Sequence, residues 1–279
     1  MQTPLRTFAF LPLAGLLALI PAVAPAQAGS FVIAQHGHPV GTATVTFIAI
    51  PRGYYSTSVV RVAMQGLNYN LSKAEQLTSA NLLKHVQLSA TVNNSAVTVT
   101  AAPDAAQILL NISANGHSTT TRLAPHPAAV FLPDFDPGAY DTLLALAVSR
   151  NNRGLWAIIP KQAGSVAPIL LATYADEQGT LDGKPVTVHH LVATISGAKT
   201  DLFSGPENQL LQAEYPEYGY ALVRNGFVLT PPAKPGAPPT PPPGQSIAPP
   251  DAQAPVPPPD QIPAPPPPPD QIPPPPPPE

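Results

Sequence analysis

Two pairs of histidines are the first residues whose spacing could carry chemistry. His36 and His38 are two positions apart, and His189 and His190 are neighbours. A His-x-His pair on a strand puts both imidazoles on one face, where they can ligate Zn²⁺ or Cu²⁺. The glycine and proline around His38 instead place the first pair in a turn, and adjacent strand residues point to opposite faces. We expect no metal centre and no cofactor. His36 and His38 are the candidate ligands for the alternative, in which the chain binds a metal ion.

The familiar hydrolase motifs do not occur in the chain. It has no Gly-x-Ser-x-Gly, no Ser-x-x-Lys and no His-Glu-x-x-His, and the lack of cysteine excludes thiolate nucleophiles and zinc–thiolate sites. Asp134 and Asp136 could form a carboxylate pair for glycoside chemistry. Because Pro137 follows directly, capping of a helix is the better interpretation of these two residues. The chain is therefore predicted not to be an enzyme, and a hydrolase assembled from distant Ser, His and Asp residues stays as an alternative.

Two tyrosine clusters are the candidate ligand-binding residues. Tyr215, Tyr218 and Tyr220 surround a Pro and a Gly, and Tyr54 and Tyr55 form the second cluster. Exposed tyrosine is a common binding group because it combines apolar area with a hydrogen-bonding tip. The alternative is a loop held in place by its own rings. The single tryptophan, Trp156, is expected in the core.

Alternating apolar and polar residues, rich in β-branched types, predict strands along most of the chain. The predicted strands are 30–35, 42–50, 56–64, 66–71, 83–92, 96–101, 107–113, 118–123, 155–159, 166–174, 184–195, 200–203, 209–214 and 220–224. Asn93-Asn94-Ser95 and Ala114-Asn115-Gly116-His117 mark short hairpin turns, because Asn and Gly tolerate positive φ.

One helix is predicted after the Asp136-Pro137 pair. Tyr140, Leu143, Leu144 and Ala147 recur at three and four residues and give it an apolar face. A second, poorer helical pattern covers Lys73 to Leu83.

These elements predict a mainly β fold, in which a curved antiparallel sheet, a half-barrel, wraps around one central helix. Connections are too short for parallel crossovers, so neighbouring strands should pair as hairpins. A two-sheet β-sandwich is the alternative.

The two ends of the chain set the domain organisation. Residues 1–28 combine one Arg, a short apolar run and a closing Ala-Gln-Ala, which predicts a cleaved signal peptide and an exported, periplasmic or cell-envelope protein; an uncleaved anchor is the alternative. Residues 29–230 form the β domain. Residues 231–279 contain 26 prolines and the unit Pro-Pro-Pro-Asp-Gln-Ile-Pro twice, which predicts a disordered polyproline II tail.

Charge argues against one class of partner. The net charge is −3 at pH 7, and no run of basic residues could follow a phosphate backbone, so nucleic-acid binding is not expected. No segment after the signal is long and apolar enough to predict a transmembrane helix.

Three pieces of the sequence resemble a group of poorly characterised exported bacterial β-domains. They are the opening Phe31 to Val45, the capped helix with its Trp-containing strand at Asp134 to Trp156, and the closing pair from Asp201 to Phe227. The fold of that group is similar to the curved half-barrel of periplasmic lipoprotein-carrier proteins, whose concave face can shelter acyl chains. The resemblance implies this fold and carries over no functional residue.

The sequence therefore favours an exported, non-enzymatic binding module whose concave sheet shelters a lipid or other apolar ligand. One alternative is a structural or assembly protein of the cell envelope that uses the proline-rich tail as spacer or as docking segment for an envelope protein. The second alternative is a hydrolase of unrecognised type.

Overall fold

Seventeen strands and one helix make up the part of the chain that the computed structural model describes, residues 27–161 and 164–231. The first eight strands are β1 (Gln27–Gln35), β2 (His38–Ile50), β3 (Gly53–Met64), β4 (Leu67–Leu77), β5 (Leu83–Val92), β6 (Ser95–Asp104), β7 (Gln107–Ala114) and β8 (His117–Leu123). The remaining elements are β9 (Ala129–Phe131), α1 (Pro137–Arg150), β10 (Leu155–Ile159), β11 (Ser165–Thr173), β12 (Glu177–Leu181), β13 (Lys184–Ile195), β14 (Ala198–Ser204), β15 (Leu210–Tyr215), β16 (Tyr220–Arg224) and β17 (Phe227–Leu229).

The strands form one large, mixed, mostly antiparallel open sheet. Strands β1 to β8 pair in chain order as successive hairpins, and β16, β15, β14 and β13 continue the sheet from the other edge of β1. The long β13 then pairs with β12 through its first half and with β11 through its second half. The prediction of a curved, mainly antiparallel sheet with one helix is confirmed, and the strands do not separate into the two sheets of a sandwich.

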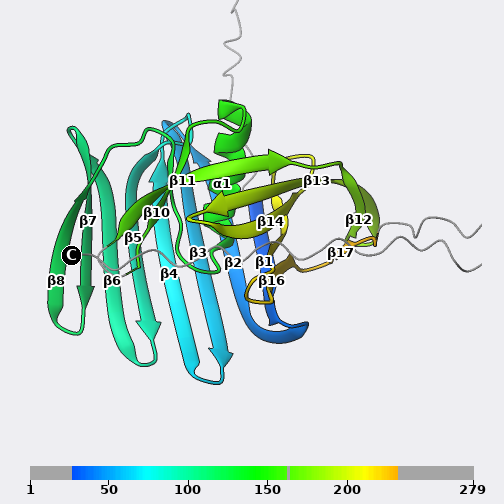
Figure 1. The fold of residues 1–279 in the computed structure, drawn as a ribbon, viewed down its shortest axis with the longest axis horizontal. Coiled ribbons are helices and arrows are strands. Elements are labelled where there is room, and N and C mark those ends of the chain that lie inside the picture. Colours follow the sequence, from blue (N-terminus) through cyan, green and yellow to red (C-terminus); the bar gives the residue numbers. More distant parts are fainter. Residues whose placement is uncertain (1–26, 162–163, 232–279) are drawn as a thin grey trace, which may run out of the picture. The chain divides into compact units, whose positions relative to one another are not determined.

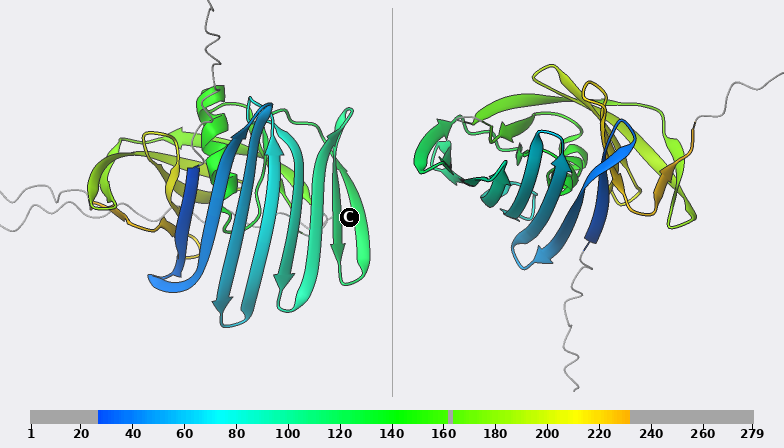
Figure 2. Two further views of the ribbon diagram at one scale, coloured as in Figure 1. Left: turned by 180° about the vertical axis from the view of Figure 1, so that it is seen from behind. Right: turned by 90° about the horizontal axis from the view of Figure 1, so that it is seen from below.

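Figures 1 and 2 show how the sheet curves around the helix. The strands β2 to β8 form a broad curved layer, and α1 with β10 and β11 lies against its inner side. The right-handed twist of neighbouring strands, summed over many strands, produces such curvature. One face of each strand in this layer therefore points to the inner side and the other to solvent.

The hairpin turns explain why consecutive strands pair. Asn93 and Asn94 have φ of 48° and 68°, and Asn115 and Gly116 have φ of 52° and 76°. Two successive residues with positive φ give a turn whose twist matches that of the flanking strands. The predicted hairpins at these two places are confirmed.

Helix α1 begins and ends where the sequence predicts. Asp136 is its N-cap, and one carboxylate oxygen accepts a hydrogen bond of 3.0 Å from the backbone N–H of Gly138. Asn151 closes the helix in the left-handed conformation, and its N–H bonds to backbone carbonyls of the last turn. Both caps satisfy backbone groups that a helix end otherwise leaves without partners.

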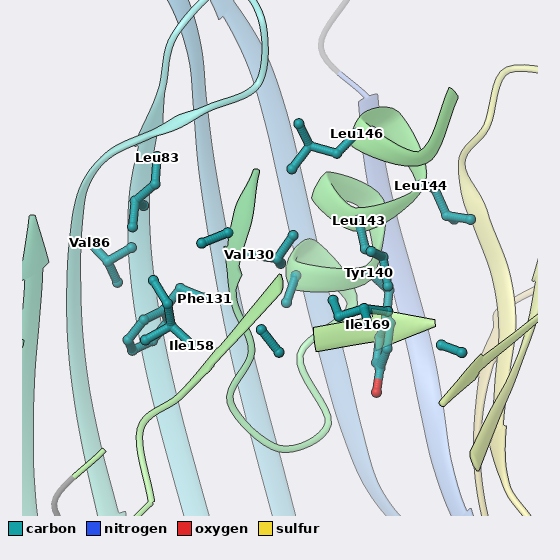
Figure 3. Close-up of a cluster of buried hydrophobic side chains, with 14 of the residues drawn as sticks. Leu83, Val86, Val130, Phe131, Tyr140, Leu143, Leu144, Leu146, Ile158 and Ile169 are labelled. Carbon is teal, nitrogen blue, oxygen red and sulfur yellow. The ribbon is translucent and has the colours of Figure 1, made fainter. Parts of the chain in front are cut away.

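The main core lies between α1 and the inner face of the sheet. Figure 3 shows side chains from α1, from β5 and from β9 to β11 meeting there; they include Val86, Phe131, Leu143, Leu146 and Ile158. All five of these side chains are buried. A second, smaller apolar cluster lies on the opposite face of β13 and β14 and contains Val188, Phe203, Leu211 and Phe227.

Several predictions of local structure are corrected. The helical pattern at Lys73 to Leu83 is wrong, because Lys73 to Leu77 belong to β4 and pair in register with β3 and β5. Strands β9, β12 and β17 were not predicted, and β9 pairs in parallel with β10. The exclusively antiparallel pairing is thus wrong at this one place, where α1 forms the crossover that a parallel pair requires.

The chain divides after Pro232 into two units. Strand β1 begins at Gln27, two residues before the predicted start of the mature protein. Predictions for residues 1–26 and for the proline-rich tail beyond 231 lie outside the described residues.

Candidate functional site

The candidate site is a cavity of about 370 Å³ on the inner face of the sheet. Strands β4 to β7 supply one wall, and the segments after β9 and β10 supply the other. Its lining comprises Tyr69, Leu88, Ala90, Val92, Val97, Val99, Ile112, Ala114, Pro133, Asp134, Pro160 and Lys161. Most of the lining is apolar, and the volume lies within the roughly 300–1,000 Å³ typical of ligand pockets.

The period of two along each strand places these side chains. On β5, Leu88, Ala90 and Val92 point inward, whereas Ser89 points to the outer face. The inward residues change from fully buried to half-buried along the strand: Leu88 is 4% exposed, and Ala90 and Val92 are intermediate. The inner face is therefore covered near the helix and open near the hairpin ends, where the small alanines of the lining leave room.

One ion pair lies at the opening of the cavity. Lys161 Nζ is 2.8 Å from Asp134 Oδ1, and the two side chains are 63% and 50% exposed. Such an exposed pair contributes little to stability. It does place a cation and an anion beside an apolar interior.

Tyr69 is the polar group deeper in the lining. Burial raises the pKa of its phenol far above the usual value, and the nearby carboxylates of Asp134 and Asp136 raise it further. The phenol therefore remains neutral, and its hydroxyl can donate or accept one hydrogen bond to a bound molecule.

A second charged group lies close by but is sealed from solvent. Lys73 Nζ is 3.1 Å from Glu75 Oε2 and 2.6 Å from Asp136 Oδ2, and all three side chains are fully buried. Burial disfavours the charged form of Lys73, but the two carboxylates outweigh this cost and raise its pKa. Burial also raises the pKa of Glu75, against the opposing effect of Lys73.

This buried cluster connects the helix to the sheet. Asp136 caps α1 with one oxygen and contacts Lys73 of β4 with the other. Ser56 and Ser58 of β3 lie opposite Glu75 and Lys73 and are buried as well. Because no substrate can reach these groups, we interpret the cluster as structural. The prediction that Asp136 caps the helix is confirmed.

Sequence reasoning missed Lys73 and Glu75. The signal was present, since Leu71, Lys73, Glu75 and Leu77 alternate with Ser72, Ala74 and Gln76. The charged residues on the apolar side of this alternation made the segment resemble a polar helix.

The two predicted tyrosine clusters do not form one site. Tyr54 packs on Phe47 at the beginning of β3, whereas Tyr220 Oη lies 3.4 Å from Met64 Sδ at its end. Ten residues of strand separate the two places, which is ~33 Å. Tyr55 is next to Tyr54 and half-buried.

The tyrosines of the β15–β16 hairpin mostly face inward. Tyr215 and Tyr220 contact the ring of Phe135 edge to face, with centroids 6.0 and 5.1 Å apart, and burial raises the pKa of Tyr215. Tyr218 is 58% exposed. These contacts agree with the alternative of a hairpin held by its own rings, and none of the five tyrosines lines the cavity.

The histidine pairs lie on separate parts of the fold. His36 and His38 are exposed beside the β1–β2 turn, and His36 packs against Gly219 of the tyrosine hairpin. Within residues 27–161 and 164–231, no group of three or more metal-ligating side chains is arranged to hold an ion. Trp156 is half-buried and stacks on His126, with centroids 3.6 Å apart.

Another hollow, of about 490 Å³, lies on the outer face of β3 to β6. Small side chains such as Ser72, Ser89 and Thr98 line it together with Arg61, so it is a shallow surface hollow with one charged group. No helix in the described part of the chain is long and apolar enough to span a membrane.

Comparisons with known proteins concern the fold. No protein-family model matches the sequence, and no curated protein matches it. Among solved structures, the chain is similar to a beta-barrel-like protein, the domain of unknown function DUF1849, from Brucella abortus. The two are 11% identical, the match covers 75% of this chain and 99% of the other, and the TM-score is 0.49.

Proposed function

We propose that this protein is an exported binding module that holds an apolar or amphiphilic molecule, such as a lipid chain, against the inner face of its sheet. The apolar cavity of about 370 Å³ between β4–β7 and the segments after β9 and β10 is the observation that carries the proposal. The export signal predicted at residues 1–28 and the resemblance to periplasmic lipoprotein carriers support it from the sequence.

The distribution of polarity favours a molecule with one apolar and one polar end. Apart from Tyr69, the interior side chains are aliphatic, and the charged groups of the lining, Asp134 and Lys161, lie together at the opening. A chain of methylene groups gains about 0.8 kcal/mol per buried group in such an interior. A polar end left at the opening keeps its contact with water.

A fluorescence titration of the full-length chain with N-phenyl-1-naphthylamine, an apolar probe, tests the proposal. We expect saturable binding that dodecanoic acid displaces. Ala90→Trp fills the cavity and should weaken binding by about tenfold or more, equivalent to about 1.4 kcal/mol.

Ser89→Trp is the matched control, because Ser89 is the neighbour of Ala90 on β5 and points to the outer face. Thermal melts of both variants establish that they are folded. A folded Ala90→Trp protein that binds the probe as tightly as Ser89→Trp overturns the proposal, as does a wild-type protein that does not bind it at all.

A further inference from the structure

A second hollow, of about 300 Å³, lies between the C-terminal half of α1 and the inner face of β13 and β14. One side is apolar and the other is polar. The lining residues are Leu144, Ala147, Val148, Asn151, Asn152, Thr173, Asp176, His189, Leu191, Ser204 and Asn208. The site does not depend on the apolar cavity, with which it shares no residue.

An aspartate orients the histidine of this hollow. His189 Nδ1 lies 2.9 Å from Asp176 Oδ1. An ionised carboxylate can only accept, so the Nδ1 atom carries the hydrogen in this contact. In the neutral imidazole, Nε2 is then the acceptor, which is the state that a general base requires.

Strand pairing places a serine on the same face as this histidine. His189 of β13 is the direct antiparallel partner of Ser204 of β14. This pair lies two residues along the strands from the buried pair Leu191 and Leu202, and so on the same face of the sheet. Directly opposed residues have Cβ atoms about 4.5–5.5 Å apart and side chains on one side of the sheet. Ser204 is 2% exposed and belongs to the lining of the hollow.

We propose that Asp176, His189 and Ser204 form a catalytic site that hydrolyses carboxylic esters with a small apolar acyl group. The three residues are of the types that act as orienting carboxylate, general base and nucleophile, which recur on unrelated folds in different chain orders. The Asp176–His189 contact is formed, and strand pairing puts Ser204 next to the imidazole. Leu144, Ala147 and Val148 of the lining provide the apolar wall for the acyl group.

In the first half-reaction, Ser204 Oγ bonds to the ester carbonyl carbon and gives its proton to His189 Nε2. The ester C–O bond then breaks, and Nε2 returns that proton to the leaving alcohol. In the second half-reaction, water bonds to the acyl carbon, gives a proton to Nε2, and releases the acid as Ser204 Oγ takes the proton back. The Asn208 amide, which also lines the hollow, is the type of donor that stabilises the developing oxyanion.

Labelling of the full-length chain with a fluorophosphonate, followed by peptide mass spectrometry, tests this proposal. We expect a covalent adduct on Ser204 and slow hydrolysis of 4-nitrophenyl butyrate. Ser204→Ala and His189→Gln should abolish both, and Asp176→Asn should lower the hydrolysis rate by about tenfold or more.

Ser165→Ala is the matched control, since Ser165 is an exposed strand serine outside the hollow. It should leave labelling and hydrolysis unchanged. A wild-type chain that gives no adduct and no hydrolysis overturns the proposal without reference to any variant. Hydrolysis that persists in Ser204→Ala, or an adduct on another serine, overturns it as well. None of these outcomes bears on probe binding by the apolar cavity.

Discussion

The aspartates of two lysine–aspartate pairs lie two residues apart on the connection between β9 and α1, and the surroundings of the two pairs separate their roles. Asp134 pairs with Lys161 at 2.8 Å, and Asp136 pairs with Lys73 at 2.6 Å. The first pair is at least half exposed, and the second is fully buried. The same two functional groups therefore stabilise the fold in one place and remain available to a ligand in the other, because water weakens the exposed attraction.

Removal of the buried lysine should have the largest effect. Lys73→Met leaves Glu75 and Asp136 as buried carboxylates without their cation, which should cost about 3–5 kcal/mol of the free energy of unfolding at pH 7. Urea denaturation followed by circular dichroism measures this loss. Lys84→Met, on an exposed position of β5, is the control and should change little.

The pH dependence of this loss makes the test stricter. Burial raises the pKa of Glu75 even with Lys73 present, so removal of the cation raises it further. A carboxyl whose pKa is raised in the folded state destabilises the protein as pH rises from the pKa of the unfolded chain towards the raised value. The deficit of Lys73→Met should therefore shrink from pH 7 to pH 4; an equal deficit at both pH values would contradict the ion-pair explanation.

Asp141, on α1, is a further carboxylate, and its partner is a backbone N–H group in place of a lysine. Asp141 Oδ1 accepts a hydrogen bond of 2.8 Å from the N–H of Leu210, while burial raises the pKa of the carboxyl to about 6. The ionised form is thus destabilising at pH 7, and Asp141→Asn keeps an acceptor oxygen but removes the charge. We expect a gain of roughly 1–3 kcal/mol at pH 7.

Near pH 4 this gain should disappear, because Asp141 then enters the folded state protonated. Urea midpoints of wild type and Asp141→Asn across pH 4 to 7 measure the difference. Asp104→Asn, at the exposed end of β6, is the control. A variant that is less stable than wild type at pH 7 would show that the bond from Leu210 needs the full negative charge.

The exposed pair should matter to a ligand more than to the fold. Lys161→Met should change the free energy of unfolding by less than about 1 kcal/mol. Loss of the ammonium group should weaken binding of dodecanoate by roughly two- to fivefold and leave the uncharged naphthylamine probe unaffected. Equal weakening of both molecules would instead indicate a change in the shape of the cavity.

The smallest effect is expected from the partner of that lysine. Asp134→Asn removes the anion from the opening, so dodecanoate should bind slightly more tightly, by about twofold, with stability unchanged within about 0.5 kcal/mol. Competition titration at low salt measures the change. Weaker dodecanoate binding would mean that Asp134 is needed to hold Lys161 in position.

Prediction from sequence succeeded where local patterns decide the structure. The bounds of β5, β10, β13 and β16 and the caps of α1 agree with the structure, because alternation, turn residues and the Asp-Pro pair are local signals. The strands that were missed, β9, β12 and β17, have three to five residues each. Elements this short depend on pairing with distant strands.

By itself, the sequence determined a mainly β domain with one capped helix, the positions of its turns and the low net charge. Only the tertiary structure decided which charged residues are buried, which inward side chains are left uncovered, and that His189 lies opposite Ser204. The physical reason is that these properties depend on groups far apart in the chain. Lys73 is tolerated in the core because Asp136 reaches it from the helix cap, and the cavity exists because a curved sheet extends beyond the elements that cover it.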